Sequence, residues 1–125
     1  MDSSNDIRGI QRIAEDPLIL VFTTSDLSVP DPDTNVDVEV HDERGRWGAT
    51  VFTLTNLATL FDKNARTGEC ANGTYYWSVD MVLVQAVSAA ILRETIRDLR
   101  AQGEFTQAFS LLADEDDSQW AGVDF

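Results

Sequence analysis

The sequence predicts an α+β fold, in which a mostly antiparallel sheet of about four strands carries helices packed on one face. Short stretches in which apolar residues alternate with polar ones, or run together, indicate strands. Other stretches place apolar residues three and four positions apart, which indicates amphipathic helices. The length of 125 residues suits one domain, and the predicted element order is α-β-β-β-α-β-α-α.

The N-terminal part predicts a helix followed by a buried strand. Residues 3–15 form the helix, which Pro17 ends. Ser3 and Asp6 have the spacing of a capping box at its start. Its apolar stripe consists of Ile7, Ile10, Ile13 and Ala14. Residues 18–24 are continuously apolar and rich in β-branched side chains, which predicts a central strand.

A hairpin follows the loop at residues 25–35. Residues 36–41 alternate between the two faces of a strand. The apolar face holds Val36, Val38 and Val40, and the polar face holds Asp37, Glu39 and His41. Residues 42–46 predict the turn, and residues 47–54 predict the returning strand. We take residues 36–41 as an edge strand whose carboxylates disfavour pairing with another chain, and a homodimer through the opposite edge stays open.

The rest of the chain predicts three helices and one strand. Thr55 can cap a helix that ends near Gly68, and residues 75–84 predict a strand after a loop. Ser88 starts a helix that ends at Gly103. A last helix places four apolar residues on one face: Phe105, Ala108, Phe109 and Leu112.

The charge is strongly negative and unevenly distributed. There are 9 Lys+Arg against 22 Asp+Glu, which gives a net charge of -13, while 43% hydrophobic residues are enough for a packed core. Residues 26–43 hold seven acids and residues 114–124 hold five, with no base in either segment. This balance excludes a nucleic-acid binder of the usual kind and disfavours anionic membranes. Solubility alone would explain the sign of the charge, whereas a docking surface for a basic partner would also explain its concentration.

Residues that could carry chemistry are few. His41 shares its strand face with Asp37 and Glu39 and could act as a base beside a carboxylate, but we interpret it as part of a solvated strand face. Cys70 has no base placed beside it by the sequence, and we interpret it as a structural thiol. We therefore expect no catalytic residue and no cofactor.

The acidic stretch that begins at Asp31 mimics the ligand spacing of a calcium loop. The residues at ligand positions are Asp31, Asp33, Asn35, Asp37, Glu39 and Asp42. A calcium loop needs glycine at its sixth position, and Val36 stands there in a β pattern. We therefore expect no metal site.

The sequence also predicts the cellular compartment of the protein and an acidic C-terminal tail. No signal-peptide-like run is present at the start, and Cys70 is the only cysteine, so we expect a cytoplasmic protein. We divide the chain into one domain at residues 1–113 and an acidic tail at residues 114–125. The tail carries Trp120 and ends at Phe125, and it looks like the acidic C-termini ending in Phe with which bacterial single-stranded-DNA-binding proteins recruit partners.

The acidic hairpin runs from Asp31 to Glu43, and Trp47 follows it. Through these features the whole chain resembles, in kind, the small acidic immunity proteins of bacterial toxin systems. The resemblance implies a non-catalytic protein that occludes a basic toxin or nucleic-acid-directed enzyme. On this interpretation, charge and apolar anchors for the partner come from Asp31, Asp33, Asp37, Glu39, Asp42, Glu43, Trp47 and Tyr76.

Three alternatives stay open. A regulatory or adaptor domain would recruit its partner through the tail, with Trp120 and Phe125 as the binding residues. A DNA mimic would space its carboxylates like duplex phosphates along one surface. A small enzyme would be built around His41.

Overall fold

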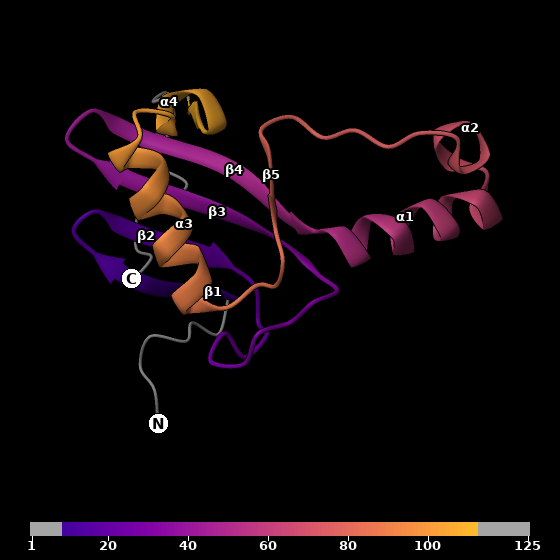
Figure 1. Ribbon diagram of the computed structural model, residues 1–125, viewed down its shortest axis with the longest axis horizontal. Helices are drawn as coiled ribbons and strands as arrows, with labels where there is room; N and C mark the ends of the chain where they lie inside the picture. Colours follow the sequence, from indigo (N-terminus) through magenta and orange to yellow (C-terminus); the bar gives the residue numbers. More distant parts are fainter. Residues whose placement is uncertain (1–8, 113–125) are drawn as a thin grey trace.

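The computed structural model describes residues 9–112 and shows a single α+β domain with a mostly antiparallel sheet (Figure 1). Its strands are β1 (Ile10–Glu15), β2 (Leu18–Phe22), β3 (Asn35–Asp42), β4 (Gly45–Thr53), β5 (Met81–Val84) and β6 (Ser110–Leu111). Its helices are α1 (Leu54–Thr67), α2 (Glu69–Gly73), α3 (Ala89–Ala101) and α4 (Phe105–Ala108). The α+β class is therefore confirmed, but the described part of the chain has six strands, and its element order differs from the predicted one.

The sheet has the strand order β1-β2-β3-β4-β5. The short strand β6 also pairs with β4, at residues 47–48, whereas β5 pairs with residues 50–53 of β4. All pairs are antiparallel except β4 and β5, which run parallel. The strand β3 lies between β2 and β4, so the prediction of an edge strand at residues 36–41 was wrong. The sequence pattern was ambiguous because a central antiparallel strand with one solvated face also alternates.

The predicted N-terminal helix is wrong over residues 10–15, which form β1. The strand returns through a turn at Asp16–Pro17 and pairs with β2. The register shifts between Arg12 and Ala14, and this bulge adds Ile13 to the strand. Because of the extra residue, Ile13 and Ala14 both pack against the core, which produces the apolar spacing that imitated a helix.

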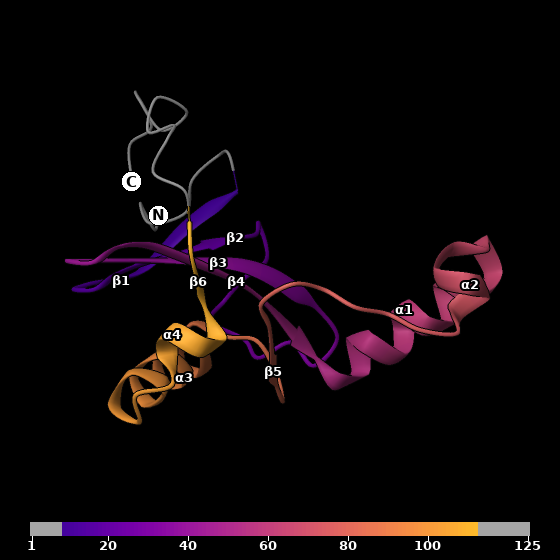
Figure 2. The same cartoon turned by 90° about the horizontal axis from the view of Figure 1, so that it is seen from above.

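The hairpin of β3 and β4 agrees with the sequence. Val36, Val38 and Val40 are buried, and their side chains alternate with Asp37, Glu39 and His41. The register pairs Val38 with Ala49 and Val40 with Trp47, so both strands contribute to the same core. The face that carries these residues is covered by α3 and α4, as Figure 2 shows.

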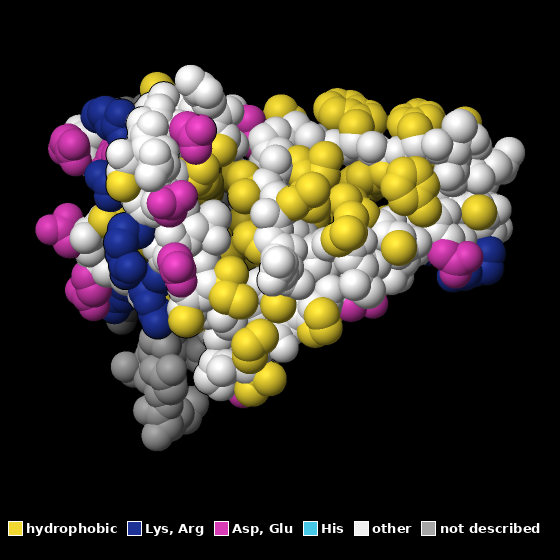
Figure 3. Space-filling model, viewed as in Figure 1, with side chains coloured by type: hydrophobic (Ala, Val, Ile, Leu, Met, Phe, Trp, Pro, Cys, Tyr) yellow, Lys and Arg dark blue, Asp and Glu magenta, His cyan; other side chains and the backbone are white. Residues whose placement is uncertain are grey.

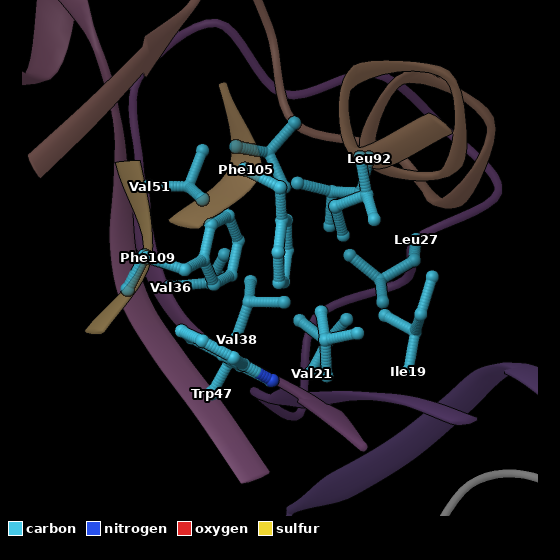
Figure 4. Packing of buried hydrophobic residues seen from close by; sticks show 14 residues of the cluster. Ile19, Val21, Leu27, Val36, Val38, Trp47, Val51, Leu92, Phe105 and Phe109 are labelled. Carbon is cyan, nitrogen blue, oxygen red and sulfur yellow. The ribbon is translucent and has the colours of Figure 1, made fainter. Parts of the chain in front are cut away.

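The helix α3 begins where Ser88 predicts, since its hydroxyl accepts a hydrogen bond from Ile91 N at 3.1 Å. Leu92 and Ile96 are buried against the sheet. Figure 4 shows Leu92 and Phe105 in the same apolar cluster as the valines of β3 and β4. Arg93 of α3 donates a hydrogen bond to the carbonyl of Ile13 in β1, and this bond joins the helix to the edge strand of the sheet.

The helices α1 and α2 do not cover the sheet; they project beyond the end of β4 (Figures 1 and 2). Thr53, two residues before the predicted cap, accepts the hydrogen bond of Asn56 N and caps α1. Gly68 ends the helix with φ 87°, as predicted. The residues assigned to α2 have left-handed backbone angles at three positions: Cys70, Ala71 and Asn72.

Two other predicted elements are shorter than expected. Only residues 81–84 of the predicted strand at residues 75–84 pair with a neighbour, because Asp80 has φ 53° and turns the chain. The last helix ends at Ala108, and Phe109 is extended. The chain then pairs with β4 as β6, so Leu112 lies away from the face that Phe105 and Phe109 share.

Between residues 9 and 112, neither α1 nor any other helix combines the length and apolar content that a membrane span requires.

Candidate protein-binding surface

The polar face of the sheet, opposite α3 and α4, contains a pocket of about 320 Å³. Three acidic residues line it: Asp37 and Glu39 come from β3, and Asp80 comes from the bend before β5. Its remaining lining is mostly apolar or backbone: Phe22, Val38, Gly48, Ala49, Thr50, Val79 and Leu112. We call this the acidic pocket. Negative charge beside apolar walls is suited to a side chain that has an apolar stem and a cationic head.

Asp37 and Glu39 project from the polar face of β3 because residues two apart in a strand share a face. Asp37 is exposed and accepts a hydrogen bond of 2.7 Å from the Thr50 hydroxyl of β4. Glu39 is less accessible, with 15% of its side chain exposed. Its Oε1 lies 3.0 Å from Nε2 of His41 and 3.8 Å from Nε of Arg46. Asp37 is therefore the carboxylate of β3 that a partner can reach most directly.

Asp80 enters the acidic pocket from the chain that leads into β5. Its carboxylate accepts a hydrogen bond of 2.5 Å from the hydroxyl of Ser110 in β6. Its carbonyl accepts a bond of 3.0 Å from Thr50 N, which holds the bend against β4. Gly48 provides the space for the opposite wall, since a Cβ atom there would lie 3.1 Å from Leu112 Cδ1.

Asp42 and Trp47 were predicted to contact a partner, and in the structure they contact each other at the hairpin turn. Only 1% of the Asp42 side chain is exposed, and 8% of Trp47 is exposed. Burial works to raise the pKa of Asp42. Hydrogen bonds from the amide and guanidinium of Arg44 and from the Trp47 indole outweigh it, so the pKa lies below its ordinary value. Glu43 is exposed at the same turn.

Asp31 and Asp33 lie at the other end of β3, away from Asp42 and Glu43. Since a strand rises about 3.3 Å per residue, the two acidic ends of the hairpin are more than about 20 Å apart. Asp31 accepts a hydrogen bond from Asp33 N in the loop. Asp33 accepts bonds of 3.1 Å from Asn56 and from Thr59, so it joins the loop to α1.

The structure therefore places the predicted partner residues at the acidic pocket, at the hairpin turn and at the opposite end of β3, with Tyr76 apart from all three. Tyr76 is half-buried, and its ring packs edge-on against Phe52 at a centroid distance of 5.7 Å. Trp120 and Phe125 lie outside the described residues. Asp80 and Val79 were missed because the sequence pattern predicted one continuous strand there, and only the parallel pairing of β5 with β4 brings them beside Asp37.

Groups that could hold a metal or act as a nucleophile are sparse. Within residues 9–112, no cluster of three or more His, Cys, Asp or Glu side chains is arranged to bind a metal ion. Cys70 is a free, half-buried thiol in the left-handed turn, whereas His41 lies on the sheet beside Glu39.

The comparisons with known proteins add no relative to this description: no family model matches the sequence, and no curated protein or solved structure matches it.

Proposed function

We propose that this chain is a non-catalytic protein-binding domain, an immunity or inhibitor protein that occludes a basic toxin or enzyme through its acidic surface. The acidic pocket is the observation that supports this proposal most strongly. Three acidic residues line it beside apolar walls, and Arg46 lies 3.8 Å from one of them, Glu39. A binding domain needs such a complementary surface and no catalytic group.

A basic side chain of the partner fits this pocket chemically. The volume of about 320 Å³ is near the lower end of the range for ligand pockets, about 300–1,000 Å³, so it suits a single side chain. The methylene stem of an arginine or lysine would lie against Val79 and Leu112, and its charged head would reach Asp37 or Asp80. Covering one essential cation in this way would block an enzyme that binds phosphate groups.

The other acidic groups would act at longer range. Glu43 is exposed at the hairpin turn, and the net charge of -13 attracts a basic protein before contact. Asp42 and Trp47 would support the surface from below, because they hold the hairpin turn rather than point outward. The association rate should therefore fall as salt rises.

The test compares two pairs of isosteric substitutions in the full chain. Asp37→Asn with Glu39→Gln removes two charges at the acidic pocket, and Glu94→Gln with Asp98→Asn removes two from exposed positions of α3. Each protein is immobilised, exposed to lysate of its own source, and eluted with rising salt. A captured basic protein is then purified, and its association rate is measured by surface plasmon resonance.

We expect the pocket variant to associate at least about tenfold more slowly at low salt, and the α3 variant to stay within about twofold of the parent. Equal rates for both variants would show that the acidic pocket is not the interface. Loss of the partner only on deletion of residues 114–125 would instead support an adaptor that binds through its tail.

A further inference from the structure

The chain between α2 and α3 exposes apolar side chains in a regular pattern. From residue 75 to residue 84, exposed positions alternate with half-buried ones. The exposed positions all carry large apolar side chains: Tyr75, Trp77, Val79, Met81 and Leu83. The half-buried positions carry both apolar and polar side chains: Tyr76, Ser78, Asp80, Val82 and Val84. An ordinary strand with one solvated face carries polar residues at its outward positions, whereas here all five outward positions are apolar.

The helix α1 extends this apolar surface. Leu54 is 72% exposed and Phe61 is 39% exposed, and Asn64 is the one buried residue of this helix. The main contacts of α1 are with α2 and with β4, not with the core under α3. Figure 3 shows hydrophobic side chains gathered over the region where Figure 1 places β5, the chain before it and α1. We call this surface the arm face. A helix of this length normally depends on packing of its apolar side; here Leu57 and Leu60 are half-buried, while Leu54 and Phe61 stay exposed in the part of the chain that the structure describes.

The arm face is also nearly uncharged. Residues 54–84 carry three acids and two bases, a net charge of -1, whereas the other parts of the chain carry 19 acids and 7 bases, a net charge of -12. The charges of the arm are paired locally, Asp62 with Arg66 and Lys63 with Glu69. The side chains of the arm itself therefore repel a second acidic protein only weakly, and the nearest part of the acidic segment at residues 26–43 is Asp33, which accepts hydrogen bonds from Asn56 and Thr59 of α1.

The size of the arm face matches what a stable interface needs. If a fully exposed large side chain presents about 200 Å², the exposed fractions of these seven residues, between 37% and 72%, amount to roughly 800 Å². A standard interface takes about 800 Å² from each partner, and the largest apolar patch of a monomer is usually about 300–600 Å².

We infer that the arm face is the interface of a symmetric homodimer, formed with the arm face of a second copy of this chain. A two-fold axis brings the same patch together from both copies, so one apolar, charge-poor surface is its own complement. Interfaces of homodimers are richer in apolar area and poorer in charge than those with transient partners. A basic partner, in contrast, would find its complementary charge at the acidic pocket, which Val79 borders, and little of it over the rest of the arm face.

The test is the mass of the full chain in solution, measured by light scattering during size exclusion and by sedimentation. At about 100 µM and about 0.15 M salt we expect twice the chain mass of 13.9 kDa. Since two copies of charge -13 repel each other, the dimer should become tighter at about 0.5 M salt. This dependence is opposite to that of an association between acidic and basic surfaces. A monomer under both salt conditions would overturn the inference.

Two variants locate the interface. Trp77→Glu with Leu83→Glu places charges at positions that are 70% and 55% exposed, so the monomer can still fold, and the dimer should weaken at least about 100-fold. Trp77→Ala is a milder variant that should weaken it about tenfold or more. Leu111→Glu is the control, because Leu111 is 58% exposed in β6 outside the arm. A charged arm variant that remains dimeric, or a dimer lost equally in the control, would contradict this assignment.

Discussion

The indole nitrogen of Trp47 donates a hydrogen bond of 3.1 Å to the carboxylate of Asp42. The two residues flank the hairpin turn, and Arg44 between them binds the same carboxylate and lies 5.2 Å from the centre of the indole ring. The other edge of the indole reaches the core, where it contacts Phe105 at a centroid distance of 5.5 Å. The hydrogen bond between Trp47 and Asp42 thereby joins the turn to the core, and Arg100 of α3, 3.9 Å from the same carboxylate, adds a second polar link.

Replacing Asp42 by Asn should destabilise the protein in a pH-dependent way. At neutral pH we expect a loss of about 1.5–3 kcal/mol in unfolding free energy, because the donors around the carboxylate lose a charged acceptor. The pKa of Asp42 is lower in the folded chain than its ordinary value of 3.8. Its contribution is therefore present above pH 3.8 and is lost as the pH falls through the folded-state pKa. Urea titrations of parent and variant at several pH values measure this, and a difference that stays constant into acid would contradict it.

Replacing Thr53 by Ala should destabilise α1, whereas replacing Thr55 should not. The Thr53 hydroxyl caps the helix and lies 3.2 Å from Thr34 N, so its loss should lower the unfolding free energy by about 1–2 kcal/mol. Thr55 is exposed in the first turn, and alanine there should change it by less than about 0.5 kcal/mol. Denaturant unfolding compares the two, and equal effects would show that Thr53 does not act as the cap.

Replacing Gly73 by Ala should be more harmful than replacing Gly103 by Ala. Both glycines have positive φ, at 79° and 75°. A Cβ at Gly73 would lie 2.6 Å from the carbonyl oxygen of Phe61, while a Cβ at Gly103 would meet nothing within 4 Å. We expect a cost of about 2–4 kcal/mol at Gly73 and about 1 kcal/mol at Gly103. Hydrogen exchange of α1 gives the local cost, and similar protection in both variants would refute the steric argument.

Replacing Phe105 by Ala should cost about 3–5 kcal/mol. Its ring is 2% exposed and stacks on Phe109 at a centroid distance of 4.7 Å. Thermal and chemical unfolding measure the loss, and Leu111→Ala, at a side chain that is 58% exposed, is the control. A loss below about 1 kcal/mol would mean that the core closes around the vacancy.

The elements that the sequence predicted well are those defined by local chemistry. The strand β3 alternates because one of its faces is solvated, and Ser88 and Gly68 mark helix ends through their own hydrogen bonds or backbone angles. The elements that were predicted wrongly depend on distant partners. Residues 10–15 are a strand because β2 pairs with them, and a bulge hid the period of two. The last helix stops early because residues 110–111 pair with β4.

The candidate site was predictable only in part, for the same reason. Asp37 and Glu39 follow from the alternation of β3, but nothing local to Asp80 indicates that it lies beside them. Conversely, Asp42 and Trp47 have the residue types of an interface, and the turn uses both internally. A pattern of charge and aromaticity identifies residues that interact, without showing whether the partner is another protein or the chain itself.

The strand order also determines the order in which the chain can fold. The strands β1 to β4 each pair with the next strand in the sequence. The connections between them, residues 16–17, 23–34 and 43–44, are all much shorter than the separation between α3 and β1. The link from Arg93 in α3 to Ile13 in β1 closes over 80 positions, and closing longer loops costs more chain entropy. We therefore expect the four-strand meander to form in the folding transition state and α3 to dock on it afterwards. Changes in the β3–β4 turn should then slow refolding, and changes in α3 should mainly speed unfolding.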